Sequence, residues 1–113
     1  MKKEKTNEYL HAMFDKQYAL QERLGNEPIH NQKFITEMTI AAIDELMEAL
    51  RETPWKSWKK KQKYNKEEFK NELIDVWHFL INLSIASGMT STETYARFML
   101  KNKENHKRQS EGY

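Results

Sequence analysis

The stretches IAAIDELMEAL (residues 40–50) and NELIDVWHFLINL (residues 71–83) decide how this chain folds. In both, apolar side chains recur every three or four positions, which is typical of a helix that buries one side. Capping residues, glycines and prolines mark where such helices begin and end. We expect four helices, from about Glu4 to Leu24, Asn31 to Glu52, Asn65 to Gly88 and Thr90 to Arg108.

Each of the two stretches also carries a pair of carboxylates three positions apart, Glu45 with Glu48 and Glu72 with Asp75. Residues at this spacing lie on one face of a helix, with Cβ atoms about 5–6 Å apart. Two such helices packed together would gather four negative charges, which is costly unless a cation lies among them. Oxygen ligands favour Mg²⁺, Mn²⁺ or Ca²⁺ over zinc. Residue types alone are compatible both with this metal site and with two partly solvated helix faces.

Composition favours a helical chain of one domain, residues 1–113. Glycine (3) and proline (2) are scarce, and the absence of cysteine excludes disulfides and thiolate metal sites. The longest apolar run, residues 76–86, is shorter than the roughly 20 residues that a membrane span needs. The N-terminus MKKEKTNEY lacks the apolar core of a secretory signal. We therefore expect a soluble, cytoplasmic protein.

Basic residues gather in two places although the net charge is only +2. One cluster lies in TPWKSWKKKQKY (residues 53–64) and the other near the C-terminus. Such clusters are most often solvated surface, and otherwise they bind phosphate, either of a nucleotide or of nucleic acid. Trp55 and Trp58 beside lysines suit a stacked base with paired phosphates. A non-catalytic helical oligomer that binds nucleic acid or a partner protein is the competing interpretation.

His78 follows Asp75 by three positions, which resembles half of a di-iron site in a helical bundle. Such a site needs a second carboxylate–histidine pair, and His11, His30 and His106 do not supply one on an apolar face. A lone histidine here is more often a hydrogen-bonded residue of a core or pocket.

Three blocks together resemble the all-α NTP pyrophosphatase superfamily, which includes the MazG-like enzymes, and within it the dimeric-type dUTPases. They are the paired carboxylates, WKSWK (residues 55–59) with DVWHF (residues 75–79), and the closing KNKENHKRQSEGY (residues 101–113). The resemblance implies an all-α bundle of four to five helices, assembled as a homo-oligomer. It also implies Mg²⁺-dependent hydrolysis of a nucleoside triphosphate, dUTP to dUMP and pyrophosphate in the first place.

The resemblance further implies a role for each matching residue. Glu45, Glu48, Glu72 and Asp75 would hold Mg²⁺, or Mn²⁺ in its place, and Glu48 would take a proton from the attacking water. The residues expected to bind the triphosphate are Lys56, Lys59, Lys101, Asn102, Asn105, Arg108 and Tyr113. Those expected around the base are Gln17, Gln21, Trp58, His78 and Asn82.

Two features differ from the family pattern. Only residues 80–100 separate DVWHF from the closing motif, where dimeric-type dUTPases usually carry extra helices, so the resemblance implies a compact, phage-type form. The N-terminal helix has Gln17, Gln21 and Asn26 but no Gln-x-x-Asn pair, so base specificity stays open. A broader pyrophosphatase that acts on dCTP or modified nucleotides is therefore the nearest alternative.

Overall fold

A computed structural model describes residues 2–112 of the chain, with side chains from residue 8 onward. Its four helices are α1 (Lys2–Arg23), α2 (Gln32–Arg51), α3 (Lys66–Ala86) and α4 (Ser91–Ser110), and the described residues form no strand. The expectation of an all-α fold is confirmed, and the four helices begin and end within one or two residues of the predicted positions.

Polar side chains cap three of the helices at their N-termini. The side-chain oxygens of Asn31, Asn65 and Thr90 accept hydrogen bonds from the backbone N–H three residues later, at 3.2, 3.2 and 3.1 Å. Each bond satisfies a donor that has no partner within the helix. The N–H of Asn65 itself donates to the carbonyl of Glu52 at 2.9 Å, which closes the loop between α2 and α3.

The two turns at the other end of α2 and α3 pack against each other. Gly88 follows α3 with φ +88°, as predicted for a glycine that ends a helix. His30 precedes α2 with φ +54°, and its N–H donates to the carbonyl of Ala86 at 2.8 Å. A Cβ on Gly88 would lie 3.3 Å from the His30 ring, so both the positive φ and the close approach favour glycine here.

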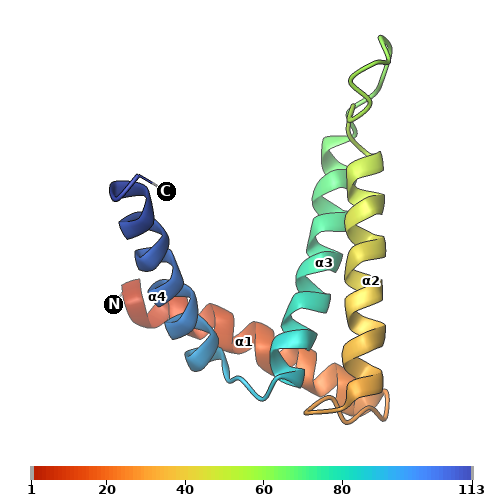
Figure 1. The fold of residues 1–113 in the computed structure, drawn as a ribbon. Coiled ribbons are helices and arrows are strands. Elements are labelled where there is room, and N and C mark those ends of the chain that lie inside the picture. The colour runs from red at the N-terminus through yellow and green to blue at the C-terminus, as the bar shows by residue number, and fades with distance from the viewer. Residues whose placement is uncertain (1, 113) are drawn as a thin grey trace.

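The helices α2 and α3 lie side by side and antiparallel, and we call this pair the hairpin (Figure 1). The helix α1 crosses the base of the hairpin and packs on α3, with Phe14, Ile81 and Ile85 in the core. The helix α4 packs on α1 and extends away from the hairpin (Figure 1). The described chain therefore has an open shape, and its N- and C-terminal ends lie on the same side.

No single helix in residues 2–112 meets the length and hydropathy needed to cross a bilayer. Helices α3 and α4 meet those two criteria only when taken together, and they are bent by 104° where they join.

Candidate functional site

Three of the four predicted metal ligands lie together where α2 faces α3. One carboxylate oxygen from each of Glu45, Glu72 and Asp75 lies within 4.8 Å of the other two. Glu45 and Glu72 are half-buried between the helices, and Asp75 is exposed at the edge. The sequence spacing explains this cluster, because each pair occupies one helix face and the antiparallel packing brings the two faces together.

Glu48 lies one turn after Glu45 and interacts with it. The negative charge of Glu45, followed by hydrogen bonding with its carboxyl group, raises the pKa of Glu48 above its ordinary value. Hydrogen bonding with Glu45, then burial, then hydrogen bonding with Glu68 raises the pKa of Glu72 to about 8. Both shifts have one cause: without a cation, clustered carboxylates are more stable when some of them keep a proton.

One oxygen of this cluster has no donor to satisfy it. The Oε2 atom of Glu45 is buried, and no hydrogen-bond donor of the described residues reaches it. A proton shared with a neighbouring carboxylate, or a bound cation, would satisfy this atom. The ligand atoms around it are all carboxylate oxygens, and hard oxygen ligands are those that Mg²⁺ and Mn²⁺ prefer. The residues present thus fit a divalent cation.

A cavity of about 550 Å³ lies between α1 and α3, next to the carboxylate cluster. Its walls are mostly apolar and include Tyr9, Met13 and Trp77, with Gln17 and His78 as polar groups. The Nδ1 atom of His78 lies 3.9 Å from Oδ1 of Asp75, so the cavity adjoins the cluster. An apolar cavity with a few polar groups is typical of a small-molecule site.

The three amides predicted around the base are all buried, at 3–6% exposure. The Nε2 atom of Gln17 donates to Oδ1 of Asn82 at 2.9 Å, and Nδ2 of Asn82 donates to Sδ of Met38 at 3.5 Å. The Oε1 atom of Gln21 accepts from Nδ2 of Asn26 at 2.8 Å. Of these amides only Gln17 lines the cavity, and the hydrogen bond with Asn82 orients the Gln17 side chain.

Trp58 lies elsewhere, in the loop at the end of the hairpin opposite α1 (Figure 1). Its side chain is 73% exposed, and its ring meets that of Trp55 edge to face at 5.8 Å. Lys56 and Lys59 line a cavity of about 490 Å³ in the same loop, together with further basic residues. The structure therefore separates Trp58 from the other residues predicted around the base.

Two further residues in this region were not predicted from the sequence. Gln62 holds the loop, because its Nε2 donates to the carbonyls of Lys56 and Lys59 at 2.6 and 2.9 Å. Arg51 lines the lysine-rich cavity, and its positive charge offsets a small part of the rise in the pKa of Glu48, so it joins the cavity to the carboxylate cluster. Its position three residues after Glu48 was a usable signal.

The phosphate-binding residues predicted near the C-terminus lie on α4, apart from the carboxylates. Lys101, Asn102, Asn105 and Arg108 are all exposed. Nη2 of Arg108 lies 3.4 Å from Oε1 of Glu104, and Nζ of Lys101 lies 4.0 Å from its Oε2. Within one chain, α4 extends away from the hairpin (Figure 1). Tyr113, the last residue of this predicted set, lies outside the described residues.

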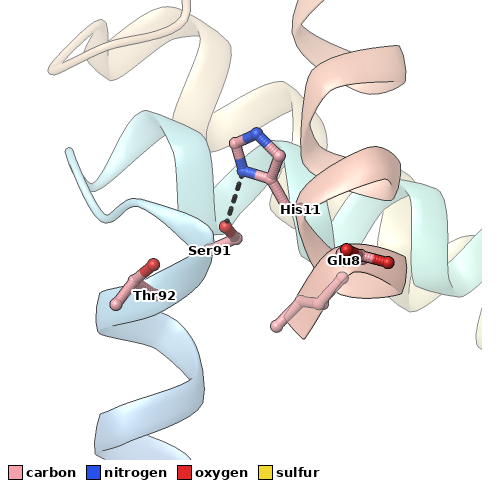
Figure 2. Close-up of a pocket in the computed structure, with 5 residues that line it drawn as sticks. Glu8, His11, Ser91 and Thr92 are labelled. Carbon is pink, nitrogen blue, oxygen red and sulfur yellow. Dashed lines mark hydrogen bonds between the residues drawn. The ribbon is translucent and has the colours of Figure 1, made fainter. Parts of the chain in front are cut away.

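A smaller cavity, of about 200 Å³, marks the contact between α1 and α4. Figure 2 shows Glu8 and His11 from α1 beside Ser91 and Thr92 from α4. Nδ1 of His11 lies 3.2 Å from Oγ of Ser91, and Nε2 lies 3.2 Å from Oδ2 of Asp15. His11 thus links the beginning of α4 to α1.

Comparisons with known proteins identify the family of the chain. Residues 9–94 match the model of a family described as dUTPase. A dCTP pyrophosphatase of Enterobacteria phage T4 is 35% identical over 71 residues, covering 52% of this chain and 42% of that protein. A dCTP pyrophosphatase of Enterobacteria phage LZ5 is 42% identical over 71 residues, with 52% and 41% covered.

The chain thus spans less than half the length of these two relatives. No solved structure gives a significant match. The family match includes both carboxylate pairs, the tryptophan-containing loop and most of α1. Because it covers well over half of the chain, the resemblance to the dimeric-type dUTPases is confirmed, and the chain belongs to the dUTPase family.

Proposed function

We propose that this protein is a Mg²⁺-dependent nucleoside triphosphate pyrophosphohydrolase that converts dUTP to dUMP and pyrophosphate. The observation that carries the proposal is the buried, donor-free Oε2 of Glu45 within a cluster of carboxylates. Such a cluster is poorly stable alone and well suited to a divalent cation. Because nucleotide pools are kept in the cytoplasm, that is the compartment we propose.

Glu45, Glu48, Glu72 and Asp75 would hold the cation. A bound Mg²⁺ supplies positive charge to triphosphate oxygens and makes a bound water more acidic. Glu48 is our candidate for the group that accepts the proton of the attacking water. It lies one turn after Glu45 and interacts with it, so its carboxylate would stand beside the other ligands of the cation.

The base would enter the cavity between α1 and α3, which adjoins the cluster at His78. Because Nε2 of Gln17 is engaged by Asn82, its Oε1 is the atom free to accept a hydrogen bond from a base. Uracil offers a donor at N3 and cytosine offers one at its exocyclic amine. The family match supports dUTP, while the dCTP pyrophosphatase relatives support dCTP as the second candidate.

Lys56 and Lys59 would contact the triphosphate from the loop that follows α2, with Arg51 beside them. Helix α4 extends away from the carboxylate cluster of its own chain (Figure 1). Its predicted phosphate-binding residues would therefore not contact a triphosphate bound at that cluster. They are Lys101, Asn102, Asn105 and Arg108. A second copy of the chain could bring its α4 to the cluster. We therefore propose a homo-oligomer, at least a dimer.

The test is hydrolysis of each deoxynucleoside and ribonucleoside triphosphate with and without Mg²⁺, with the products separated. We expect pyrophosphate and a nucleoside monophosphate from dUTP, dependent on the metal. Faster turnover of dCTP would assign the second candidate. If no nucleotide is hydrolysed and the protein binds oligonucleotides with a steep salt dependence, the lysine clusters serve nucleic acid instead.

A further inference from the structure

The loop between α2 and α3 differs in composition from the rest of the chain. We call residues 53–65 the tip loop, because they project from the end of the hairpin opposite α1 (Figure 1). Five of these thirteen residues are lysine, and none is Asp or Glu. Since the whole chain has a net charge of only +2, the residues outside the tip loop carry a net negative charge. Positive charge is therefore concentrated at this end of the hairpin.

The lysines of the tip loop are not neutralised by nearby carboxylates. On the helices, Lys33, Lys70 and Lys107 each lie within 4.0 Å of a glutamate of the same helix. No carboxylate in the described part of the chain lies that close to a lysine of the tip loop. Four of the five loop lysines are exposed, and they are Lys59, Lys60, Lys61 and Lys63. Unpaired cations gathered on one surface attract a polyanion.

Aromatic side chains alternate with these lysines and remain in water. Trp58 is 73% exposed, Tyr64 is 47% exposed and Trp55 is 41% exposed. The rings of Trp55 and Trp58 meet edge to face at 5.8 Å, and Nζ of Lys56 lies 5.6 Å from the centre of the Trp55 ring. Exposed rings beside unpaired cations suit a ligand that has both flat rings and negative charges.

The tip loop has a defined conformation although it projects into water. The Oε1 atom of Gln62 accepts a hydrogen bond from the N–H of Lys56 at 3.1 Å, and its Nε2 donates to the carbonyls of Lys56 and Lys59. The N–H of Lys59 also donates to the carbonyl of Lys56, at 3.0 Å. A surface that is already ordered loses less conformational entropy when it binds a ligand. The backbone that carries the rings and the cations is therefore preorganised.

We propose that the tip loop binds single-stranded nucleic acid, with a base stacked on Trp58 and the loop lysines against the sugar–phosphate backbone. A single strand exposes the flat faces of its bases, whereas a duplex stacks them on one another, so only the single strand offers them to Trp58. A free triphosphate would occupy Lys56 and Lys59 in the proposed function. That leaves three more lysines of the tip loop for a longer polyanion.

Two other anionic partners fit the tip loop less well. Binding at a membrane surface needs an apolar face that enters the acyl boundary, and the tip loop has no Leu, Ile, Val, Phe or Met. An acidic peptide would pair with the lysines but would not place a flat ring on Trp58 at each repeat. Nucleic acid has a negative charge and a flat ring in every repeating unit, so it matches both features of the loop.

This inference goes beyond the proposed function and does not depend on it, because binding is measured in EDTA without hydrolysis. The full chain is titrated into labelled oligothymidine of about 12 nucleotides, and fluorescence anisotropy gives Kd at several salt concentrations. If about four phosphates are contacted, the logarithm of affinity should fall against that of salt with a slope of about −3. Oligouridine of the same length, titrated in parallel, distinguishes DNA from RNA. No binding at low salt, or equal affinity for a duplex of that length, would overturn the proposal.

Charge reversal locates the binding surface. Lys60→Glu combined with Lys63→Glu should weaken oligothymidine binding by at least about tenfold and make the salt slope shallower. Lys103→Glu combined with Lys107→Glu is the matched control, because it changes the net charge equally at two exposed positions of α4. The control should change Kd by less than about threefold. Equal weakening by both pairs would mean that the strand responds only to net charge, and the proposal would be wrong.

Substitution of Trp58 tests stacking separately from charge. Trp58→Ala should weaken binding by at least about tenfold and leave the salt slope unchanged, because it removes a ring and no charge. Trp58→Phe should restore most of the affinity, and circular dichroism should show unchanged helix content in both variants. If Trp58→Ala binds as tightly as the unaltered protein, stacking on this ring is excluded. Tighter binding to phosphatidylserine vesicles or polyglutamate than to oligothymidine would likewise overturn the proposal.

Discussion

The hairpin and α4 both carry polar residues at regular helical spacing, but those of the hairpin face a second helix and those of α4 face water. In the hairpin the two carboxylate pairs face each other and bring three oxygens within 4.8 Å. On α4 the basic residues point into water, and Lys101 and Arg108 both approach Glu104 of the same helix. Spacing puts residues on one face in both cases, but only packing against a second helix turns a face into a site.

The largest expected effect tests the hairpin side of this contrast. Asp75→Ala should lower turnover by about a thousandfold or more, because catalysis of this kind depends on positioned charge. Steady-state kinetics with saturating Mg²⁺ would measure it, with Asp44→Ala as an exposed acidic control on α2. Retention of more than about a tenth of the activity would remove Asp75 from the site.

The next effect tests α4. If its end closes over the triphosphate, deleting residues 108–113 should lower kcat/KM by at least about a hundredfold while the melting temperature barely changes. Lys107→Ala, which removes a neighbouring exposed charge, is the control. Normal kinetics in the truncated protein would mean that the closing motif has no catalytic role. The hairpin would then contribute to the site and the end of α4 would not.

Thermal stability tests whether the carboxylates of the hairpin interact with one another. Carboxylates gathered without a cation repel one another, so Mg²⁺ in the millimolar range should raise the melting temperature by mass action. Glu48→Gln combined with Asp75→Asn should raise it by several degrees in EDTA and should remove most of the response to Mg²⁺. A melting curve that neither change moves would show that these carboxylates do not interact strongly in solution.

The smallest effect is on the pH dependence of the metal-free protein. The pKa of Glu72 is raised from 4.5 to about 8 by folding, so the folded state binds the proton more tightly than the unfolded state. The stabilisation is fully present below pH 4.5 and is lost as the pH rises towards 8. Melting in EDTA should therefore move to lower temperature across this range. Glu72→Gln should flatten the dependence, and an equal slope in that variant would assign it to other groups.

The sequence was sufficient for the helices and for the carboxylates. Asn65 and Thr90 cap where their types predict, and Gly88 ends α3 with a positive φ. The meeting of Glu45 with Glu72 follows from two short-range regularities, helical spacing and the antiparallel packing of neighbouring helices. These features depend on residues close in the chain or on adjacent elements.

The positions of the remaining site residues depend on long-range packing, which the sequence does not encode locally. Asn82 could not be assigned to the support of Gln17 without knowing how α1 crosses the hairpin. The distance of Trp58 from the cavity follows from the direction in which the loop leaves α2. The position of α4 depends on its contact with α1 through His11 and Ser91, and no sequence motif predicts that contact.

The hydrogen bond between Gln17 and Asn82 joins residues 65 positions apart, while the hairpin is made from helices adjacent in sequence. Contacts that are local in sequence form early in folding, and those that close long loops form late. The hairpin, with its carboxylates, is therefore the part of the chain that can form first. The cavity between α1 and α3 exists only after α1 docks, so the binding site for a base is completed later than the carboxylate cluster.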